Sequence, residues 1–267
     1  MPKIISPMKK ITLVLLFCGF VSSACAESFN ETMHTLNRDI YKTVTAPAHF
    51  DHSDWIKAGA VAGGALALYS LDSEIRDMFQ RNRGGTTNSI EDVFKSAGRL
   101  ETAVPAFVLL YAGGRIFDNA KLQKTALVSL ESFFISGLIF EGVKFATHRD
   151  RPSENASPYK WHGPGFYGAH QSFPSGDAAT AFALLTPVAH YYGDTPAIAP
   201  LAYGTAALAA LGRVNHNEHW ASDIFVGSAL GYFTAKAVIK YREGGTRLSL
   251  LPILDGNSKG LLLVNRF

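Results

Sequence analysis

The stretch Gly212-Arg213-Val214-Asn215-His216-Asn217-Glu218-His219-Trp220-Ala221-Ser222-Asp223 places an arginine, a histidine and an aspartate just before an apolar, helix-like run. His219 and Asp223 are four residues apart, so they share one face if the chain is helical here. An aspartate so placed can accept a hydrogen bond from one imidazole nitrogen and leave the other nitrogen free to attack. Arg213 carries a planar guanidinium that suits phosphate. The stretch predicts a nucleophile, its orienting group and an anion-binding group, although caps and surface pairs also use these residues.

A second informative stretch, Phe173-Pro174-Ser175-Gly176-Asp177, leads into the apolar run 178–185. Ser175 is a natural N-cap, and the free N–H groups of the first helical turn favour an anion at that end. Gly176 allows a phosphate to approach the backbone closely. An ordinary capped helix after a proline turn is the alternative interpretation.

A third stretch, 144–152, carries Lys144 and Arg151 seven residues apart, followed by Pro152. Both cations can face one point if the helix continues or unwinds late, and the proline ends it. The alternative is a basic helix C-terminus that interacts with the helix dipole.

Taken together and in this order, the three stretches resemble the type 2 phosphatidic acid phosphatase (PAP2) and haloperoxidase superfamily. The family pattern is Lys-x6-Arg-Pro, then Pro-Ser-Gly-His, then Ser-Arg-x5-His-x3-Asp. This chain has Lys144…Arg151-Pro152, then Pro174-Ser175-Gly176-Asp177, then Gly212-Arg213…His219…Asp223.

The resemblance implies an all-α bundle of about six core helices around one phosphate pocket, in an exported or membrane-associated bacterial branch of the family. The phosphoryl oxygens would be bound by Lys144, Arg151, Arg213, Ser175 and the Gly176 backbone N–H. His219 would form a phosphohistidine and Asp223 would orient it. No metal or other cofactor is expected, because three cations and a helix N-terminus supply the positive charge.

Two residues depart from the family pattern. Gly212 replaces a serine, and Asp177 replaces the histidine that usually protonates the leaving oxygen. A carboxyl group can do this only while it is protonated, and a general acid is typically worth about 10²–10⁴-fold in rate. We therefore expect a preference for diphosphate substrates, such as an isoprenoid diphosphate, whose leaving group needs less help. His148, His162 and His170 are alternative acids, although a surface or packing role is the favoured interpretation of each.

Residues 1–26 have the pattern of a secretory signal, with three lysines, the apolar run Ile11–Val21 and a small-x-small sequence ending at Ala26. Both cysteines lie within it, so no disulfide is expected in the mature chain. Removal of the signal would lower the formal charge from +3 to 0, with 22 Lys and Arg against 22 Asp and Glu. The sequence therefore gives no indication of a nucleic-acid partner.

Apolar segments follow that favour helix over strand by their length and their alanine and leucine content. A membrane span needs about 20 mostly apolar residues, and most of these segments are shorter, so an exported bundle seated on a membrane is favoured over six spans. Residues 27–46 carry an apolar stripe at helical spacing, which fits a core helix or an interfacial one. The segments are Ile56–Leu71, Val104–Phe117, Thr125–Val143, Ala178–Tyr192, Ile198–Leu211 and Ile224–Ile239.

The expected organisation is a signal peptide (1–26), an N-terminal helix and linker (27–55), a helical catalytic domain (56–243) and a C-terminal tail (244–267). In the tail, Asp255-Gly256 between two apolar runs predicts a β-hairpin. The loop 153–173 carries the aromatic residues Tyr159, Trp161, Phe166 and Tyr167. They predict contact with a lipid tail, a lining of the pocket entrance or simple anchoring of the loop.

The sequence thus predicts a metal-independent phosphatase of the cell envelope, facing the periplasm and associated with the membrane, that acts on a phosphorylated lipid or isoprenoid. A catalytically weakened phosphate-binding envelope protein and a vanadate-dependent haloperoxidase are the alternatives. An intact His219 and Asp223 argue against a pure binding protein, which needs no oriented nucleophile.

Overall fold

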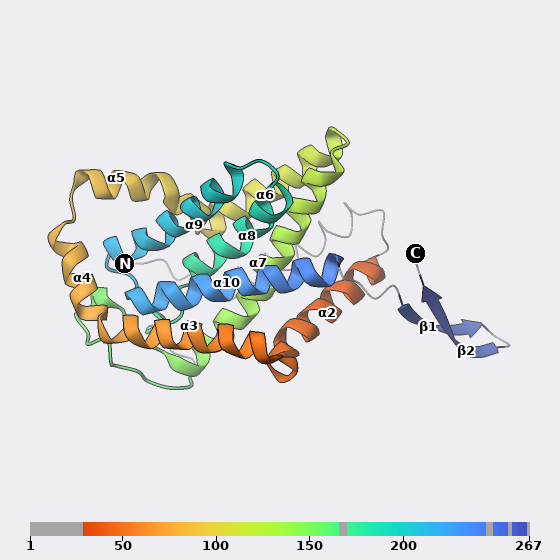
Figure 1. The fold of residues 1–267 in the computed structure, drawn as a ribbon, viewed down its shortest axis with the longest axis horizontal. Coiled ribbons are helices and arrows are strands. Elements are labelled where there is room, and N and C mark those ends of the chain that lie inside the picture. The colour runs from red at the N-terminus through yellow and green to blue at the C-terminus, as the bar shows by residue number, and fades with distance from the viewer. Residues whose placement is uncertain (1–28, 166–169, 244–247, 256–257, 266–267) are drawn as a thin grey trace.

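The computed structural model of the chain describes residues 29–165, 170–243, 248–255 and 258–265. The described part is dominated by α-helices (Figure 1). The helices are α2 (Phe29–Thr45), α3 (His52–Ser70), α4 (Asp72–Arg81), α5 (Gly85–Phe94), α6 (Leu100–Ile116), α7 (Ala120–Thr147), α8 (Gly176–Tyr191), α9 (Ile198–Asn215) and α10 (Ala221–Glu243). Short 3₁₀ helices are η1 (Ala46–His49), η2 (Lys95–Ala97) and η3 (Pro152–Glu154).

The helices predicted from the apolar segments are confirmed as α3, α6, α7, α8, α9 and α10, and the N-terminal stripe is α2. In α2, Leu36 is buried and packs with α7 and α10, as expected of a core helix. Helices α4 and α5 were not predicted, because each has only ten residues of mixed polarity. The predicted signal peptide lies outside the described residues.

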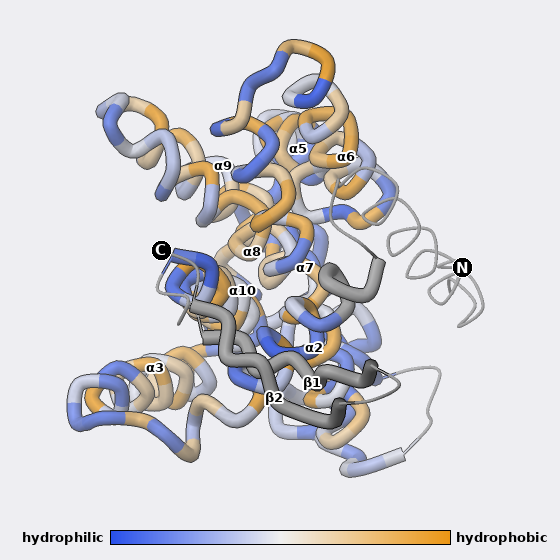
Figure 2. The backbone as a smooth tube through the Cα atoms, turned by 90° about the vertical axis from the view of Figure 1, so that its right-hand side faces the viewer, coloured by the Kyte–Doolittle hydropathy of each residue, from blue (hydrophilic) through white to orange (hydrophobic). Residues whose placement is uncertain are grey.

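Helix α8 lies in the middle of the bundle, between α9 and α10 and against α7 (Figures 1 and 2). Its inner face is built from alanines that are fully buried, such as Ala179 and Ala183. Helix α10 approaches this face through Gly227 and Gly231, one turn apart. A methyl group on Gly231 would overlap the carbonyl oxygen of Ala179, so the close contact between the two helices depends on small residues.

Two apolar clusters complete the core on either side of α7. Phe107 of α6, Leu130 of α7 and Leu184 of α8 pack together on one side. On the other side, Val128 of α7 contacts the cluster that contains Val238 of α10. Because α7 packs on both sides, its C-terminal end is held in a defined position relative to the start of α8.

Helix α7 is also the one helix in the described part of the chain that is long and apolar enough to cross a membrane, with a mean hydropathy of 1.6 over its most apolar window. A core helix passes the same test, and 44% of that window is buried. Glu131 within α7 is buried and pairs with Arg242 of α10 at 2.7 Å. Length and composition therefore permit a span, while the packing is that of a bundle helix.

The tail contains strands β1 (Leu248–Asp255) and β2 (Ser258–Asn265), which pair antiparallel with Leu248 opposite Asn265. Residues 256–257 between the strands lie outside the described part. The hairpin as a whole, and its packing against the bundle, therefore stay predictions.

Candidate active site

The three sequence stretches meet where the C-terminal ends of α7 and α9 lie near the N-terminal ends of α8 and α10. Ser175 caps α8, with its Oγ accepting from the backbone N–H of Ala178, and its own N–H donates to the Asp223 carbonyl at 3.0 Å. The Lys144 ammonium lies 3.6 Å from the point where a side chain on Gly176 would begin. A buried cation therefore stands beside the N-terminus of α8, where free N–H groups favour an anion.

The stretch 212–223 is not one helix, which corrects the prediction that His219 and Asp223 share a helical face. Helix α9 ends at Asn215, Asn217 takes a left-handed conformation (φ 60°), and α10 begins at Ala221. The backbone N–H of His219 donates to the Arg213 carbonyl at 3.3 Å, which closes the turn. The turn, rather than a helical repeat, sets the position of His219 relative to Arg213.

The imidazole of His219 is held by a carbonyl group. Its Nδ1 lies 2.7 Å from the backbone oxygen of Ser172 and 3.8 Å from Asp223 Oδ2. The predicted direct hydrogen bond to Asp223 is therefore wrong, since 3.8 Å is too long for one. Asp223 instead accepts from the hydroxyl of Ser172 at 2.5 Å and from the Trp220 N–H at 2.9 Å. Asp223 thus acts on His219 through Ser172 and through its charge.

The buried positions of His219 and Asp223 change their acid–base properties. Burial lowers the pKa of His219, and the nearby charge of Arg151 acts in the same direction, while contact with Asp223 opposes them. Burial works to raise the pKa of Asp223, but contact with His219 and the charge of Arg149 leave it below its ordinary value. At neutral pH the pair is therefore a neutral imidazole beside a carboxylate. With the Nδ1 proton donated to Ser172, the lone pair is on Nε2.

The predicted phosphate-binding arginines are paired with carboxylates. Glu218 Oε2 bridges them, because it contacts Arg213 Nη2 and lies 3.4 Å from Arg151 Nη1. Arg213 also lies 3.3 Å from Glu91 Oε1. Burial works to raise the pKa of Glu218, but the charges of Arg213 and Arg151 lower it overall. The structure thus brings Arg151 and Arg213 to one anionic group, which is the arrangement that a phosphoryl group requires.

Asp177 belongs to the same cluster. It lies in the first turn of α8, and its Oδ2 is 2.9 Å from Arg213 Nε. The side chain is about one-third exposed. The residue that departs from the family pattern is therefore held against a guanidinium at the open side of the cluster.

The model of the PAP2 superfamily matches residues 125–247, which include all three stretches. This part of the chain belongs to the PAP2 superfamily.

The PAP2 domain is similar to proteins that carry phosphatase names. A lipid A 1-phosphatase of Porphyromonas gingivalis is 27% identical over 175 residues, which is 64% of this chain and 35% of the relative. The chain thus spans about a third of the length of that relative.

Two solved structures share the fold. LpxE of Aquifex aeolicus has a TM-score of 0.51 at 21% identity, over 64% of this chain and 96% of its own. A transmembrane PAP2 type phosphatidylglycerolphosphate phosphatase of Bacillus subtilis has a TM-score of 0.52 at 19% identity, over 70% of this chain and 96% of its own.

Arg149 is a central residue of the PAP2 domain that the sequence analysis missed. Its guanidinium is fully buried and reaches Asp223 Oδ1 at 2.5 Å, Asp72 Oδ2 at 2.7 Å, Ser222 Oγ at 2.8 Å and the Pro158 carbonyl at 2.9 Å. Its position two residues before Arg151 was the available signal, but a second arginine in a basic stretch is usually exposed. The aromatic rings around it are Tyr69, Trp161 and Trp220, with centroids at 4.9, 5.0 and 5.5 Å.

The structure explains why position 212 is a glycine. A methyl group on Gly212 would overlap Cγ of Glu91, whose side chain fills the space in which the family has a serine. Glu91 is buried and contacts both Arg213 and His216. The replacement of the family's serine by Gly212 is therefore coupled to an acidic residue on α5, 121 positions earlier in the chain.

Of the three histidines considered as alternative acids, His148 lies at the end of α7, within the stretch 144–152, and His162 and His170 lie in the loop that follows. His148 is buried, and its Nδ1 lies 3.0 Å from the Gly163 carbonyl. His162 and His170 both contact the carboxylate of Asp150. His148 thus makes a hydrogen bond with the backbone of the loop, while the other two histidines form a separate cluster with Asp150.

The aromatic residues of this loop pack on α3. Tyr159 and Tyr69 form an edge-to-face pair at 5.2 Å, and the Trp161 indole N–H donates to the Tyr69 hydroxyl at 2.9 Å. These contacts favour anchoring of the loop over the alternative of a lipid contact for these two residues. Phe166 and Tyr167 lie outside the described residues.

Proposed function

We propose that the chain is a phosphatase that hydrolyses a phosphorylated lipid or isoprenoid (di)phosphate through a phosphohistidine intermediate. The observation that carries this proposal is the buried His219, whose Nδ1 is hydrogen-bonded to the Ser172 carbonyl. With Nδ1 engaged as a donor, the Nε2 lone pair is available to act as a nucleophile. The lipid phosphatase names of the relatives support a lipid as the substrate class.

In the first step, Nε2 of His219 attacks phosphorus and the bond from phosphorus to the leaving oxygen breaks. The imidazole gains a positive charge, which the Asp223 carboxylate stabilises. In the second step, water attacks the phosphohistidine and the P–N bond breaks. Inorganic phosphate leaves with one proton of the water, and the other proton passes to solvent, which supplies the proton that the leaving group takes up. His219 returns to its neutral form.

The charge on the transferred phosphoryl group is balanced by cations of the chain. Lys144, Arg151 and Arg213 bind its oxygens, together with Ser175 and the N–H of Gly176 at the start of α8. These groups supply the charge that a metal ion provides in other phosphatases. Glu218 bridges Arg151 and Arg213 in the structure, so a phosphoryl group has to replace its carboxylate there.

The identity of Asp177 limits which leaving groups the chain can release. Its Oδ2 lies 2.9 Å from Arg213 Nε, and a carboxylate in this ion pair has no proton to donate to a leaving oxygen. A diphosphate substrate releases a phosphate group that needs little protonation, whereas an alkyl monoester releases an alkoxide that needs a general acid. The chain should therefore favour diphosphates over alkyl monoesters.

Phosphate release from an isoprenoid diphosphate and from an alkyl monophosphate, measured for the wild type and for His219→Ala, tests the proposal. We expect the wild type to release phosphate faster from the diphosphate, and His219→Ala to lose at least about 10³-fold in rate. Release by the variant at the wild-type rate would contradict the nucleophile. A preference for the monoester at neutral pH would contradict the role of Asp177, and no release from either substrate would favour a phosphate-binding protein.

The setting proposed for this activity is the cell envelope, with the catalytic domain (56–243) facing the periplasm on a membrane surface. The signal pattern of residues 1–26 supports export, and the apolar α7 and the lipid substrates of the relatives support membrane association. Fractionation of the mature protein into a carbonate-resistant membrane pellet or a soluble periplasmic fraction tests the placement.

A further inference from the structure

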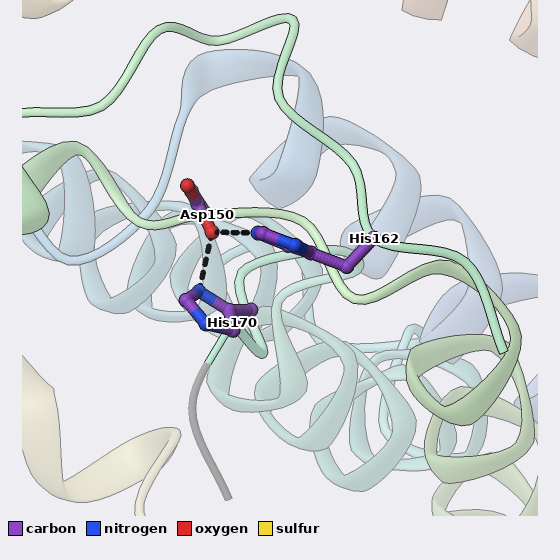
Figure 3. Close-up of side chains that lie close together, drawn as sticks. All are labelled: Asp150, His162 and His170. Atoms are coloured by element: carbon purple, nitrogen blue, oxygen red, sulfur yellow. Dashed lines mark hydrogen bonds and ion pairs between the residues drawn. The ribbon is translucent and has the colours of Figure 1, made fainter. Parts of the chain in front are cut away.

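A cluster of two histidines and an aspartate lies in the loop between α7 and α8 (Figure 3). Asp150 is buried, and its Oδ1 lies 2.7 Å from His162 Nε2 and in contact with His170 Nδ1. The three ligand atoms lie within 4.8 Å of one another, and the two imidazole rings are 4.1 Å apart. From this arrangement we propose that Asp150, His162 and His170 bind a divalent transition-metal ion of the zinc type.

The chemistry of the three groups selects this class of metal. Two imidazole nitrogens and one carboxylate oxygen suit zinc, whereas magnesium and calcium prefer oxygen ligands alone. Zinc binds such atoms at about 2.0–2.2 Å, which places tetrahedral ligand atoms about 3.4 Å apart. The His162 and Asp150 ligand atoms, 2.7 Å apart, need to separate by less than about 1 Å to reach this geometry.

Hydrogen bonding alone does not account for the cluster. The Nδ1 of His170 is buried and makes no hydrogen bond of acceptable geometry within the described residues. It nevertheless contacts Asp150 and lies 3.3 Å from Glu154 Oε2. A nitrogen that is close to two carboxylates but not aligned as a donor is arranged as a metal ligand. Glu154 can then provide a fourth ligand.

The surroundings orient the ligands. Lys160 Nζ lies 3.0 Å from Asp150 Oδ2, so the second carboxylate oxygen is held and Oδ1 faces the histidines. The Asp150 carbonyl accepts from the Trp220 indole N–H at 2.9 Å. Groups that hold the first ligands in place typically strengthen metal binding about 10–100-fold.

The position of the cluster gives the ion a positioning role in the candidate active site. Asp150 stands between Arg149, which pairs with Asp223, and Arg151, which contacts Glu218. His170 comes two residues before Ser172, whose carbonyl holds His219. An ion bound to Asp150 and His170 ties together the two ends of the loop that carry these groups, and it takes no part in the bond-breaking steps.

Equilibrium dialysis of the purified, EDTA-treated full chain against micromolar zinc chloride, followed by elemental analysis, tests the proposal. We expect one zinc ion per chain in the wild type, and binding at least about 10-fold weaker in His162→Ala and in His170→Ala. His190→Ala is the matched control, because His190 has a similar exposure and also pairs with a carboxylate, Glu243 at 3.2 Å. Every variant keeps both cysteines, so zinc bound to them contributes equally.

Thermal unfolding provides a second readout that does not depend on activity. A ligand that binds the folded chain raises its melting temperature. We expect added zinc to raise the melting temperature of the wild type and of His190→Ala. The melting temperatures of His162→Ala and His170→Ala should not rise. The melting temperature without zinc shows whether each variant folds. A wild type that binds no zinc, or His162→Ala and His170→Ala variants that bind it as tightly as His190→Ala, would overturn the proposal.

Discussion

His219 Nδ1 lies 2.7 Å from the carbonyl oxygen of Ser172, and the hydroxyl of the same serine donates to Asp223 at 2.5 Å. Ser172 therefore stands between the imidazole and the carboxylate with both of its polar groups in use. The carbonyl fixes the tautomer of His219, and the carboxylate provides the charge that stabilises a positively charged imidazole. Two functions that the sequence assigned to Asp223 alone are divided between two residues.

The titration of His219 provides the first prediction. Burial lowers the pKa of His219, so it loses its proton at a lower pH than an exposed histidine, whose ordinary value is 6.5. The neutral form therefore persists below that value. Histidine NMR, with the signal assigned by its loss in His219→Ala, should show a midpoint below 6.5 and a proton on Nδ1 at pH 7. A midpoint above 6.5 would contradict the effect of burial.

Replacement of Asp223 by asparagine should destabilise the fold. The Arg149 guanidinium is fully buried, and it would keep only Asp72 as a charged partner. Removal of one partner of a buried ion pair typically costs about 3–5 kcal/mol, and we expect the low end of this range because Asp72 remains. Urea unfolding followed by circular dichroism measures the change.

Asp194→Asn is the matched control for that experiment. Asp194 pairs with Lys121 at 3.1 Å on the surface, with 70% of its side chain exposed. An exposed pair is worth about 0–1 kcal/mol, so the urea midpoint should change little. Equal shifts in the two variants would show that burial of the Arg149 pair has no special energetic role.

Glu218→Gln should strengthen the binding of inorganic phosphate. The charges of Arg213 and Arg151 lower the pKa of Glu218, against the effect of burial, so it is ionised at neutral pH and would compete with phosphate at the proposed phosphate-binding arginines. Removal of this charge should lower the inhibition constant of phosphate roughly 3- to 10-fold, the range expected of a partly exposed ion pair.

The control for Glu218→Gln is Asp77→Asn, which removes an exposed carboxylate that pairs with Arg76 at 3.1 Å. This substitution should leave the inhibition constant unchanged. Weaker phosphate binding by Glu218→Gln would instead mean that Glu218 holds the arginines in their binding positions.

Gly212→Ser should destabilise the chain because of Glu91. The added side chain would overlap Glu91 Cγ, and overpacking of this kind typically costs about 1–3 kcal/mol. In a Glu91→Ala background the space that Glu91 Cγ fills is open, so Gly212→Ser should destabilise the chain less. A double-mutant cycle from urea unfolding measures the coupling between the two residues.

Gly204→Ser on the same helix is the control for this cycle. No atom lies within 4 Å of the position of its added side chain, so the change should stay within about 0.5 kcal/mol in both backgrounds. An equal cost for Gly212→Ser with and without Glu91 would show that the glycine does not depend on this residue.

The sequence by itself determined the longer helices and the identity of the family. Apolar runs of helical length predicted α3 and α6 to α10, and Ser175 marked the start of α8, because helix formation and capping depend on residues close together in the chain. The order of the three stretches indicated the PAP2 superfamily for the same reason, since each motif is contained in a few residues.

Only the tertiary structure decided the partners within the site. Arg149 meets Asp223 across 74 residues, Arg213 meets Glu91 across 122, and His219 meets the Ser172 carbonyl across 47. A local pattern cannot specify contacts at such separations, because they depend on how the helices pack. The turn between α9 and α10 illustrates the difference: the sequence placed His219 four residues from Asp223, and the fold placed Ser172 between them.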